Sequence, residues 1–284
     1  MLRILSIDTT PFHSLPFLNV SSSGKPVREL LPFLRGQVEG LPEGLDALFI
    51  TADLQGRVRS VGGSAATCLL GESVAECAEE LAAQGLIPAT ERMGVVLAGD
   101  FYCREGLDKR GGSGDVRSVW AAFAQRFQWV AGVAGNHDLL GDRWLKADLL
   151  EFKQQPGIHF LDGDLSEADG LMIAGLSGVI GNPERPFRRT ELEFNTITRA
   201  LADLGPDLLV MHDGPEGGEH QLGSSSVRQA LQNARRTLII RGHAYWEEPL
   251  AVLSNGTQIL NSDSRVVLLG RADVSGGRKV AGFD

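Results

Sequence analysis

The stretches VVLAGD, residues 95–100, and VAGVAGNHD, residues 130–138, share one arrangement. Each is a short apolar run that passes through a glycine and ends in residue types that bind metals. Three further runs repeat the pattern: residues 48–51 before Asp53, residues 208–211 before His212, and residues 238–240 before His243. Runs of this length with such boundaries are typical of buried strands. We therefore expect a layered α/β fold with functional residues at the strand ends.

The strand ends also indicate the chemistry of the site. In open α/β folds, ligands bind beyond the carboxyl ends of the strands. The residues expected there are two carboxylates, one amide and two imidazoles: Asp53, Asp100, Asn136, His212 and His243. A mixed oxygen and nitrogen set without thiolate suits Mn, Fe or Zn better than an iron–sulfur cluster or Ca²⁺ alone. The sequence therefore predicts a metal centre.

In order and spacing, the motifs resemble those of the calcineurin-like metallophosphoesterases, which are D-x-H, G-D, G-N-H-D/E, a lone His and G-H-x-H. The matching segments are Asp53-Leu54-Gln55, Gly99-Asp100, residues 135–138, His212 and residues 242–245. The resemblance covers residues 46 to about 270. It implies an α/β fold, namely a four-layer α/β/β/α sandwich of two mixed β-sheets flanked by helices.

The resemblance also implies the metal ligands. One ion would be held by four residues that are all present: Asp100, Asn136, His212 and His243. The other would be held by Asp53 and Asp100 together with Gln55 and Tyr245, which stand where the family has histidine. Glutamine offers a neutral carbonyl oxygen, and tyrosine binds only as phenolate. We therefore expect one or two ions per chain, Mn or Fe before Zn, with the second position weak, selective or altered.

A phosphoesterase mechanism follows from the same resemblance. A bound metal lowers the pKa of a coordinated water toward about 7, so that water can attack a phosphomonoester or phosphodiester. His137 would act on the leaving group as a general acid or an electrostatic stabiliser, and Asp138 would orient and charge its ring. The alternative is a non-catalytic scaffold that has lost one metal. Gln55 and Tyr245 favour this alternative, whereas the intact His137 opposes it.

Composition bounds the partners and the compartment. The chain has 284 residues and a net charge of −9, so nucleic acid is an unexpected partner and a small phosphorylated substrate is favoured. Three cysteines form neither a disulfide framework nor a metal pattern, and no run is apolar enough to span a membrane. We expect a cytoplasmic protein. The oligomeric state is left open.

We expect one metallophosphoesterase domain over residues 46–284, preceded by an extension, residues 1–45, whose extra strand and loop pack on it. The strand over residues 1–7 ends at Asp8, which makes Asp8 a rival for the first motif. Asp53 is preferred because a glycine-rich loop, a helix and the Asp100 strand follow it in βαβ order. His13, in a proline-spaced loop over residues 10–16, is a further candidate ligand, although a solvated side chain is its ordinary role.

Four helices are predicted from caps and apolar spacing. Their expected starts are Ser73, Asp115, Thr190 and one of Ser225 and Ser226. We expect Trp120 of the second helix in the core and Leu192 of the third facing inward. The glycine-rich residues 111–114 do not follow a strand, so we interpret them as a rim of the active site and not as a phosphate-binding loop.

Overall fold

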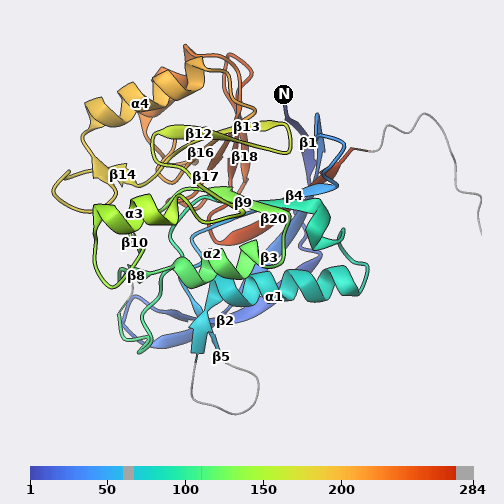
Figure 1. Cartoon of the computed structure of the whole chain (residues 1–284), viewed down its shortest axis with the longest axis vertical. Helices are drawn as coiled ribbons and strands as arrows, with labels where there is room; N and C mark the ends of the chain where they lie inside the picture. The colour runs from blue at the N-terminus through green and yellow to red at the C-terminus, as the bar shows by residue number, and fades with distance from the viewer. Residues whose placement is uncertain (60–66, 110, 273–284) are drawn as a thin grey trace, which may run out of the picture.

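Two mixed β-sheets lie face to face in the computed structural model, which describes residues 1–59, 67–109 and 111–272 (Figure 1). The larger sheet contains β11 (Ile158–Phe160), β9 (Trp129–Gly132), β7 (Met93–Leu97), β4 (Ala47–Ala52), β20 (Arg265–Arg271), β3 (Pro26–Glu39), β2 (His13–Val20), β5 (Arg57–Arg59) and β6 (Thr67–Leu69), in that order. Strand β1 (Arg3–Ile7) pairs with β3. The smaller sheet contains β12 (Asp164–Ala168), β13 (Leu171–Leu176), β16 (Leu208–Met211), β17 (Leu238–Arg241), β19 (Gln258–Asn261) and β18 (Leu250–Val252).

Within each sheet, the strands that carry the expected metal ligands run parallel to one another. In the larger sheet, β4 pairs in parallel with β7, and β7 with β9. In the smaller sheet, β16 pairs in parallel with β17. Because parallel strands end at the same edge, the loops that leave these strands start side by side. The pairing therefore gathers the motifs at one edge of each sheet.

The alternation of side chains along the strands explains why two sheets stack. On β4, Phe49 faces one hydrophobic cluster, whereas Leu48 and Ile50 face another. On β16, Leu208 lies in the cluster between the sheets and Leu209 lies under the helices. Successive side chains of a strand point to opposite faces, so strands that are apolar at every position bury both faces.

In the described part of the chain, five helices cover the outer faces of the two sheets. Helices α1 (Leu70–Ala83), α2 (Arg117–Ala124) and α3 (Lys146–Phe152) contribute to the core on the larger sheet. Helices α4 (Glu191–Asp203) and α5 (Ser225–Gln232) contribute to the core on the smaller sheet. A 3-10 turn, η1 (Thr90–Arg92), precedes β7. The layers are therefore helices, sheet, sheet and helices, which confirms the expected α/β/β/α sandwich.

Two short strand pairs lie outside the sheets. Strand β8 (Gly114–Asp115) pairs with β10 (Asp138–Leu139), and β14 (Val179–Ile180) pairs with β15 (Arg188–Arg189). The first pair holds the glycine-rich residues 111–114 beside the end of the G-N-H-D motif. A Cβ on Gly111 would lie 3.4 Å from Cε1 of His137.

The helix predictions are partly confirmed. Thr190 caps α4 by accepting a hydrogen bond from the Glu193 amide, and α5 begins at Ser225. The predicted start of α1 at Ser73 is wrong, because the helix begins at Leu70 and Glu72 accepts the Leu69 amide at 2.8 Å. Helix α3 has no counterpart among the predictions.

Two expectations about packing have opposite outcomes. Trp120 is fully buried, as expected. Leu192 is 80% exposed in the first turn of α4, so its expected inward orientation is wrong. It lies on the solvent side of the stripe formed by Phe194 and Leu201, which are buried under the smaller sheet.

The first 45 residues supply strands to the larger sheet. Residues 10–16 were expected as a loop, but His13 begins β2, which forms a hairpin with β3. Strand β3 in turn pairs in parallel with β20, which lies next to β4. Among the residues that the structure describes, no helix is long and apolar enough to cross a membrane.

We predict that Trp120→Ala lowers the free energy of unfolding by about 3–5 kcal/mol, because it leaves a cavity in a packed core. The Trp120 ring lies 5.7 Å from that of Phe152 and 5.3 Å from that of Phe160. The control is Leu192→Ala, which should stay within about 0.5 kcal/mol of the unaltered protein. Urea unfolding followed by circular dichroism measures both, and equal effects would contradict the packing described here.

Candidate metal centre

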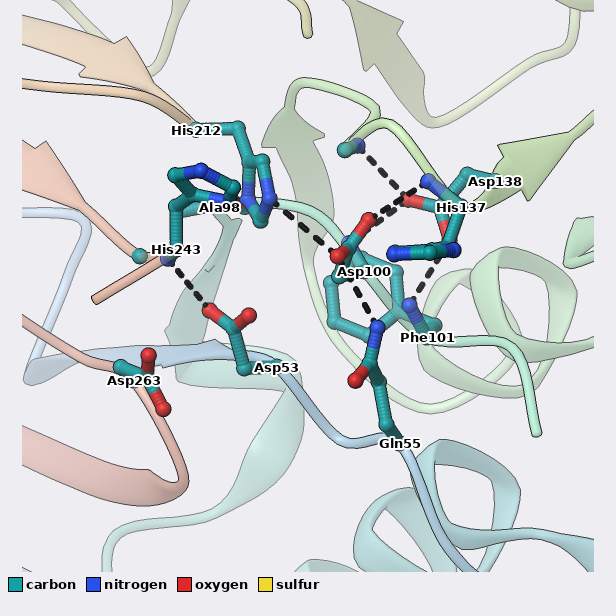
Figure 2. Close-up of polar contacts among 12 residues, drawn as sticks. Asp53, Gln55, Ala98, Asp100, Phe101, His137, Asp138, His212, His243 and Asp263 are labelled. Atoms are coloured by element: carbon teal, nitrogen blue, oxygen red, sulfur yellow. Dashed lines mark hydrogen bonds and ion pairs between the residues drawn. The ribbon is translucent and has the colours of Figure 1, made fainter. Parts of the chain in front are cut away.

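Five of the expected ligand residues meet at the edge where the parallel strands end, namely Asp53, Gln55, Asp100, His212 and His243 (Figure 2). The loops that carry them are tied together across the chain. The Asp53 amide donates to the Gly99 carbonyl at 2.8 Å, and the Gly242 amide donates to the His212 carbonyl at 3.2 Å. Residues that are far apart in the sequence, from β4, β7, β16 and β17, are therefore held in one cluster.

Backbone strain is concentrated in this cluster. Asp53, Asp100 and His243 have φ values of 54°, 61° and 70°, in the left-handed region that non-glycine residues seldom adopt. Such conformations cost free energy and recur at functional sites, where the surrounding structure maintains them. Here the strained turns direct three candidate ligands away from the strands and toward a common point.

Two glycines are required because the loops that follow β7 and β9 approach each other closely. A Cβ on Gly135 would lie 1.9 Å from Oδ1 of Asp100, and a Cβ on Gly99 would lie 2.5 Å from the Gly135 nitrogen. Any side chain at either position would collide with the neighbouring loop. The glycines of the G-D and G-N-H-D motifs therefore allow the two loops to pack together.

The first metal position is well formed. Asp100, His212 and His243 each offer one ligand atom, and these atoms lie within 4.8 Å of one another. The buried Oδ1 of Asn136 has no hydrogen-bond partner among the described residues, nor has Nε2 of His212. Nδ1 of His212 contacts the Ala98 carbonyl at 2.8 Å, which leaves Nε2 as the ligand atom. Orphaned donor atoms of these types fit a bound divalent cation.

The electrostatics of the two imidazoles differ. Burial opposes a charge on His212, but the carboxylates of Asp100 and Asp53 outweigh burial and raise the pKa of His212 to about 10. Burial and the charge of His212 lower the pKa of His243 to about 4. The cluster thus favours one positive charge beside Asp100 and a neutral imidazole at His243. A cation bound there would take the place of the proton on His212.

Asp138 has contacts other than the expected one. Its Oδ2 accepts the amides of Asp100 and Gly135, both at 2.8 Å, and its Oδ1 accepts the amide of Phe101 at 2.7 Å. Burial and the charge of Asp100 outweigh these bonds and raise its pKa to about 6. Nδ1 of His137 has no partner among the described residues, so the expected contact between Asp138 and that ring is not present. Asp138 positions the backbone instead.

His137 lies next to the ligands without joining them. Its backbone amide donates to Oδ1 of Asp100 at 2.9 Å, and its ring is half-buried beside Gly111. A half-buried imidazole that borders the metal position without joining it is suited to exchange a proton with a bound molecule.

The second position is less complete. Nε2 of Gln55 donates to Oδ2 of Asp100 at 2.9 Å, and Oδ2 of Asp53 accepts the His243 amide at 2.8 Å. Tyr245 is 58% exposed, and its ring packs against the guanidinium of Arg265, whose Cζ lies 4.6 Å from the ring centre. No described contact links Tyr245 to this position. The structure therefore brings Asp53, Gln55 and Asp100 together and does not bring Tyr245 to them.

One carboxylate at this edge was not predicted from the sequence. Asp263 is 8% exposed, pairs through its backbone with Ala52, and points toward Asp53 (Figure 2). The available signal was its place, since it comes two residues after the end of β19, whose central residues are apolar. The other candidates lie elsewhere. Strands β20 and β3 separate Asp8 from β4, and the ring of His13 lies against Phe33 and Cys77.

The comparisons with known proteins agree with this geometry. A family model described as calcineurin-like phosphoesterase matches residues 50–246, which include every motif named above. No curated protein matches the chain. A solved crystal structure has the same fold, with a TM-score of 0.51 and 14% sequence identity over 78% of this chain and 90% of that chain. The chain belongs to the calcineurin-like phosphoesterase family.

Proposed function

We propose that the protein is a metal-dependent phosphoesterase that hydrolyses a small phosphomonoester or phosphodiester. The observation that carries the proposal is the cluster of Asp100, His212 and His243. The buried Oδ1 of Asn136, which has no described partner, is the fourth proposed ligand atom, and His137 is a neighbouring group that is not a ligand. When bound, a divalent metal of the Mn, Fe or Zn type would supply Lewis-acid activation of water and of the phosphoryl group. The four ligand atoms would hold that ion.

The residues around the ion have separate tasks in this proposal. His137 protonates the leaving oxygen from its ring. Asp138 keeps the loops after β7 and β9 at a fixed distance through its three amide contacts. Gly111 keeps the rim beside His137 open, because a side chain there would approach the ring.

Two further proposals concern the substrate and the cellular compartment. A net charge of −9 disfavours a polyanionic nucleic acid and leaves a small soluble substrate as the proposed partner. All three cysteines are free thiols, which favours a reducing compartment such as the cytoplasm.

The second candidate function is a non-catalytic scaffold of the same family. The observation that favours it is the position of Tyr245, which packs against Arg265 outside the cluster. Hydrolysis of p-nitrophenyl phosphate and of its bis ester, measured with added Mn²⁺, separates the two candidates. Turnover supports the enzyme, and the preferred ester indicates the substrate class. Absence of turnover in protein that contains metal supports the scaffold.

We predict that His137→Ala lowers kcat by about 100- to 10,000-fold, the usual contribution of a general acid. Metal content should remain unchanged, because the ring is not a ligand. The matched control is His220→Ala, which removes an exposed histidine and should keep full turnover. Steady-state kinetics and elemental analysis on the same samples measure both effects. Full turnover in His137→Ala would exclude the proposed role of this ring.

We predict that Asp100→Asn weakens Mn²⁺ binding by at least about 10- to 100-fold, since changes to groups that only support metal ligands already cost that much. Asn keeps the size of the side chain but removes the charge that faces His212 at 3.3 Å. Isothermal titration with Mn²⁺ measures the affinity, with Asp8→Asn as a matched carboxylate at another strand end. Unchanged affinity in Asp100→Asn would contradict the ligand assignment.

A further inference from the structure

The loops that carry the two imidazole ligands meet at a buried arginine. Arg241 is the last residue of β17 and precedes Gly242 and His243. Its side chain is fully buried, although a guanidinium remains charged at all ordinary pH values. Burying a charge costs free energy unless hydrogen bonds compensate for the lost water. The contacts of this guanidinium therefore show which parts of the molecule it holds in place.

The guanidinium donates to backbone carbonyls of two loops. Nε and Nη2 donate to the Gly242 carbonyl at 3.0 and 2.6 Å, in the turn that carries His243. Nη1 donates to the carbonyls of Pro215 and Leu222 at 3.0 and 2.7 Å, in the loop that follows His212. One side chain therefore joins the loops that leave β16 and β17.

The Gly242 carbonyl belongs to the peptide unit that precedes His243. Because a peptide unit is planar, its carbonyl and the following amide cannot turn independently. Arg241 holds the carbonyl, and Oδ2 of Asp53 accepts the His243 amide at 2.8 Å. The unit is thus held from both sides, next to a residue whose φ is 70°. A strained conformation of this kind persists only where the surroundings maintain it, and Arg241 supplies one of the two contacts that do so.

The neighbouring residues are shaped to accept this arginine. A Cβ on Gly214 would lie 2.9 Å from Cβ and Cδ of Arg241, so a side chain there would press on the stem. The Cζ atom of Arg241 lies 5.2 Å from the ring centre of Trp246, whose Nε1 donates to the same Leu222 carbonyl at 2.7 Å. A planar fork can reach carbonyls on both loops, whereas the single ammonium of lysine cannot.

We propose that Arg241 is a positioning residue for the first metal position. It acts through the Gly242 carbonyl and orients the imidazole of His243 toward Asp100 and His212. The inference rests on the metal centre of the proposed function. Arg241 precedes the G-H-x-H motif and is not itself a ligand. It joins the loops after β16 and β17, as Asp138 joins the loops after β7 and β9.

The test measures the ion and its ligands on the full-length protein. Protein stripped with a chelator is titrated with Mn²⁺ by calorimetry, and pulsed electron paramagnetic resonance counts the imidazole nitrogens bound to the ion. We expect two imidazoles in the unaltered protein. Arg241→Lys should weaken Mn²⁺ binding by about 10- to 100-fold and lose one imidazole, that of His243. Gly214→Ala keeps the guanidinium and crowds its stem, so it should change both readouts in the same direction even where Arg241→Lys fails to fold.

The matched control is Arg271→Lys. The guanidinium of Arg271 also donates to backbone carbonyls, those of Leu41, Pro42 and Leu45, but it lies at the other end of β20. This variant should keep the Mn²⁺ affinity and both imidazoles. Urea unfolding of each variant shows the change in stability separately from the change at the metal.

Two results would overturn the proposal: unchanged Mn²⁺ affinity in both Arg241→Lys and Gly214→Ala, or lower stability with both imidazoles still bound to the ion. Neither readout involves a substrate, so both are independent of the proposed hydrolysis. Loss of one imidazole in the variants of a protein without turnover would support the role of Arg241 and contradict the enzyme. Turnover in the unaltered protein with both imidazoles retained in the variants would do the opposite.

Discussion

The carboxylate of Asp138 is the contact on which the metal centre depends. It accepts amides from Asp100 and Phe101, which follow β7, and from Gly135, which follows β9. This single buried group therefore joins the loop that carries Asp100 to the loop that carries Asn136 and His137. Charged acceptors make hydrogen bonds stronger than neutral ones, so the bonds offset part of the cost of burying the carboxylate.

The contact is possible only because the loops lack side chains at their closest point. Gly135 meets Oδ1 of Asp100 where a Cβ would lie at 1.9 Å, and Gly99 meets Gly135 in the same way. The left-handed backbone of Asp100 then turns its carboxylate outward. One oxygen accepts the His137 amide, and the other faces Gln55 and His212. Oδ2 of Asp100 is therefore oriented by three features acting together: the two glycines, the buried carboxylate of Asp138 and the strained turn at Asp100.

Sequence reasoning predicted the parts that depend on local pattern. Apolar runs that end in ligand residues predicted β4, β7, β9, β16 and β17, because a buried strand needs apolar side chains on both faces. The hairpin of β2 and β3 was missed, since prolines at positions 11 and 16 suggested a loop and the pairing partners are distant in sequence. Asp263 was missed for a similar reason. Its place beside Asp53 follows from backbone pairing with Ala52, and no local pattern reveals that contact. The direction of the Tyr245 side chain could not be predicted from the local sequence either, because its ring packs against Arg265 of β20, which is distant in the sequence.

Both metal positions include Asp100. They differ in whether the side chain that faces Asp100 can become a metal ligand without moving. Oδ2 of Asp100 faces Nε2 of His212 and Nε2 of Gln55. An imidazole can lose its proton and present a lone pair at the same atom, so His212 changes from donor to ligand without moving. An amide nitrogen cannot do so, and Gln55 must rotate to present its oxygen. The first position is therefore preorganised for a cation, whereas the second requires a rotation of the Gln55 side chain. Two ions at these positions would bind with different affinities, because only one of them meets its ligands already in place.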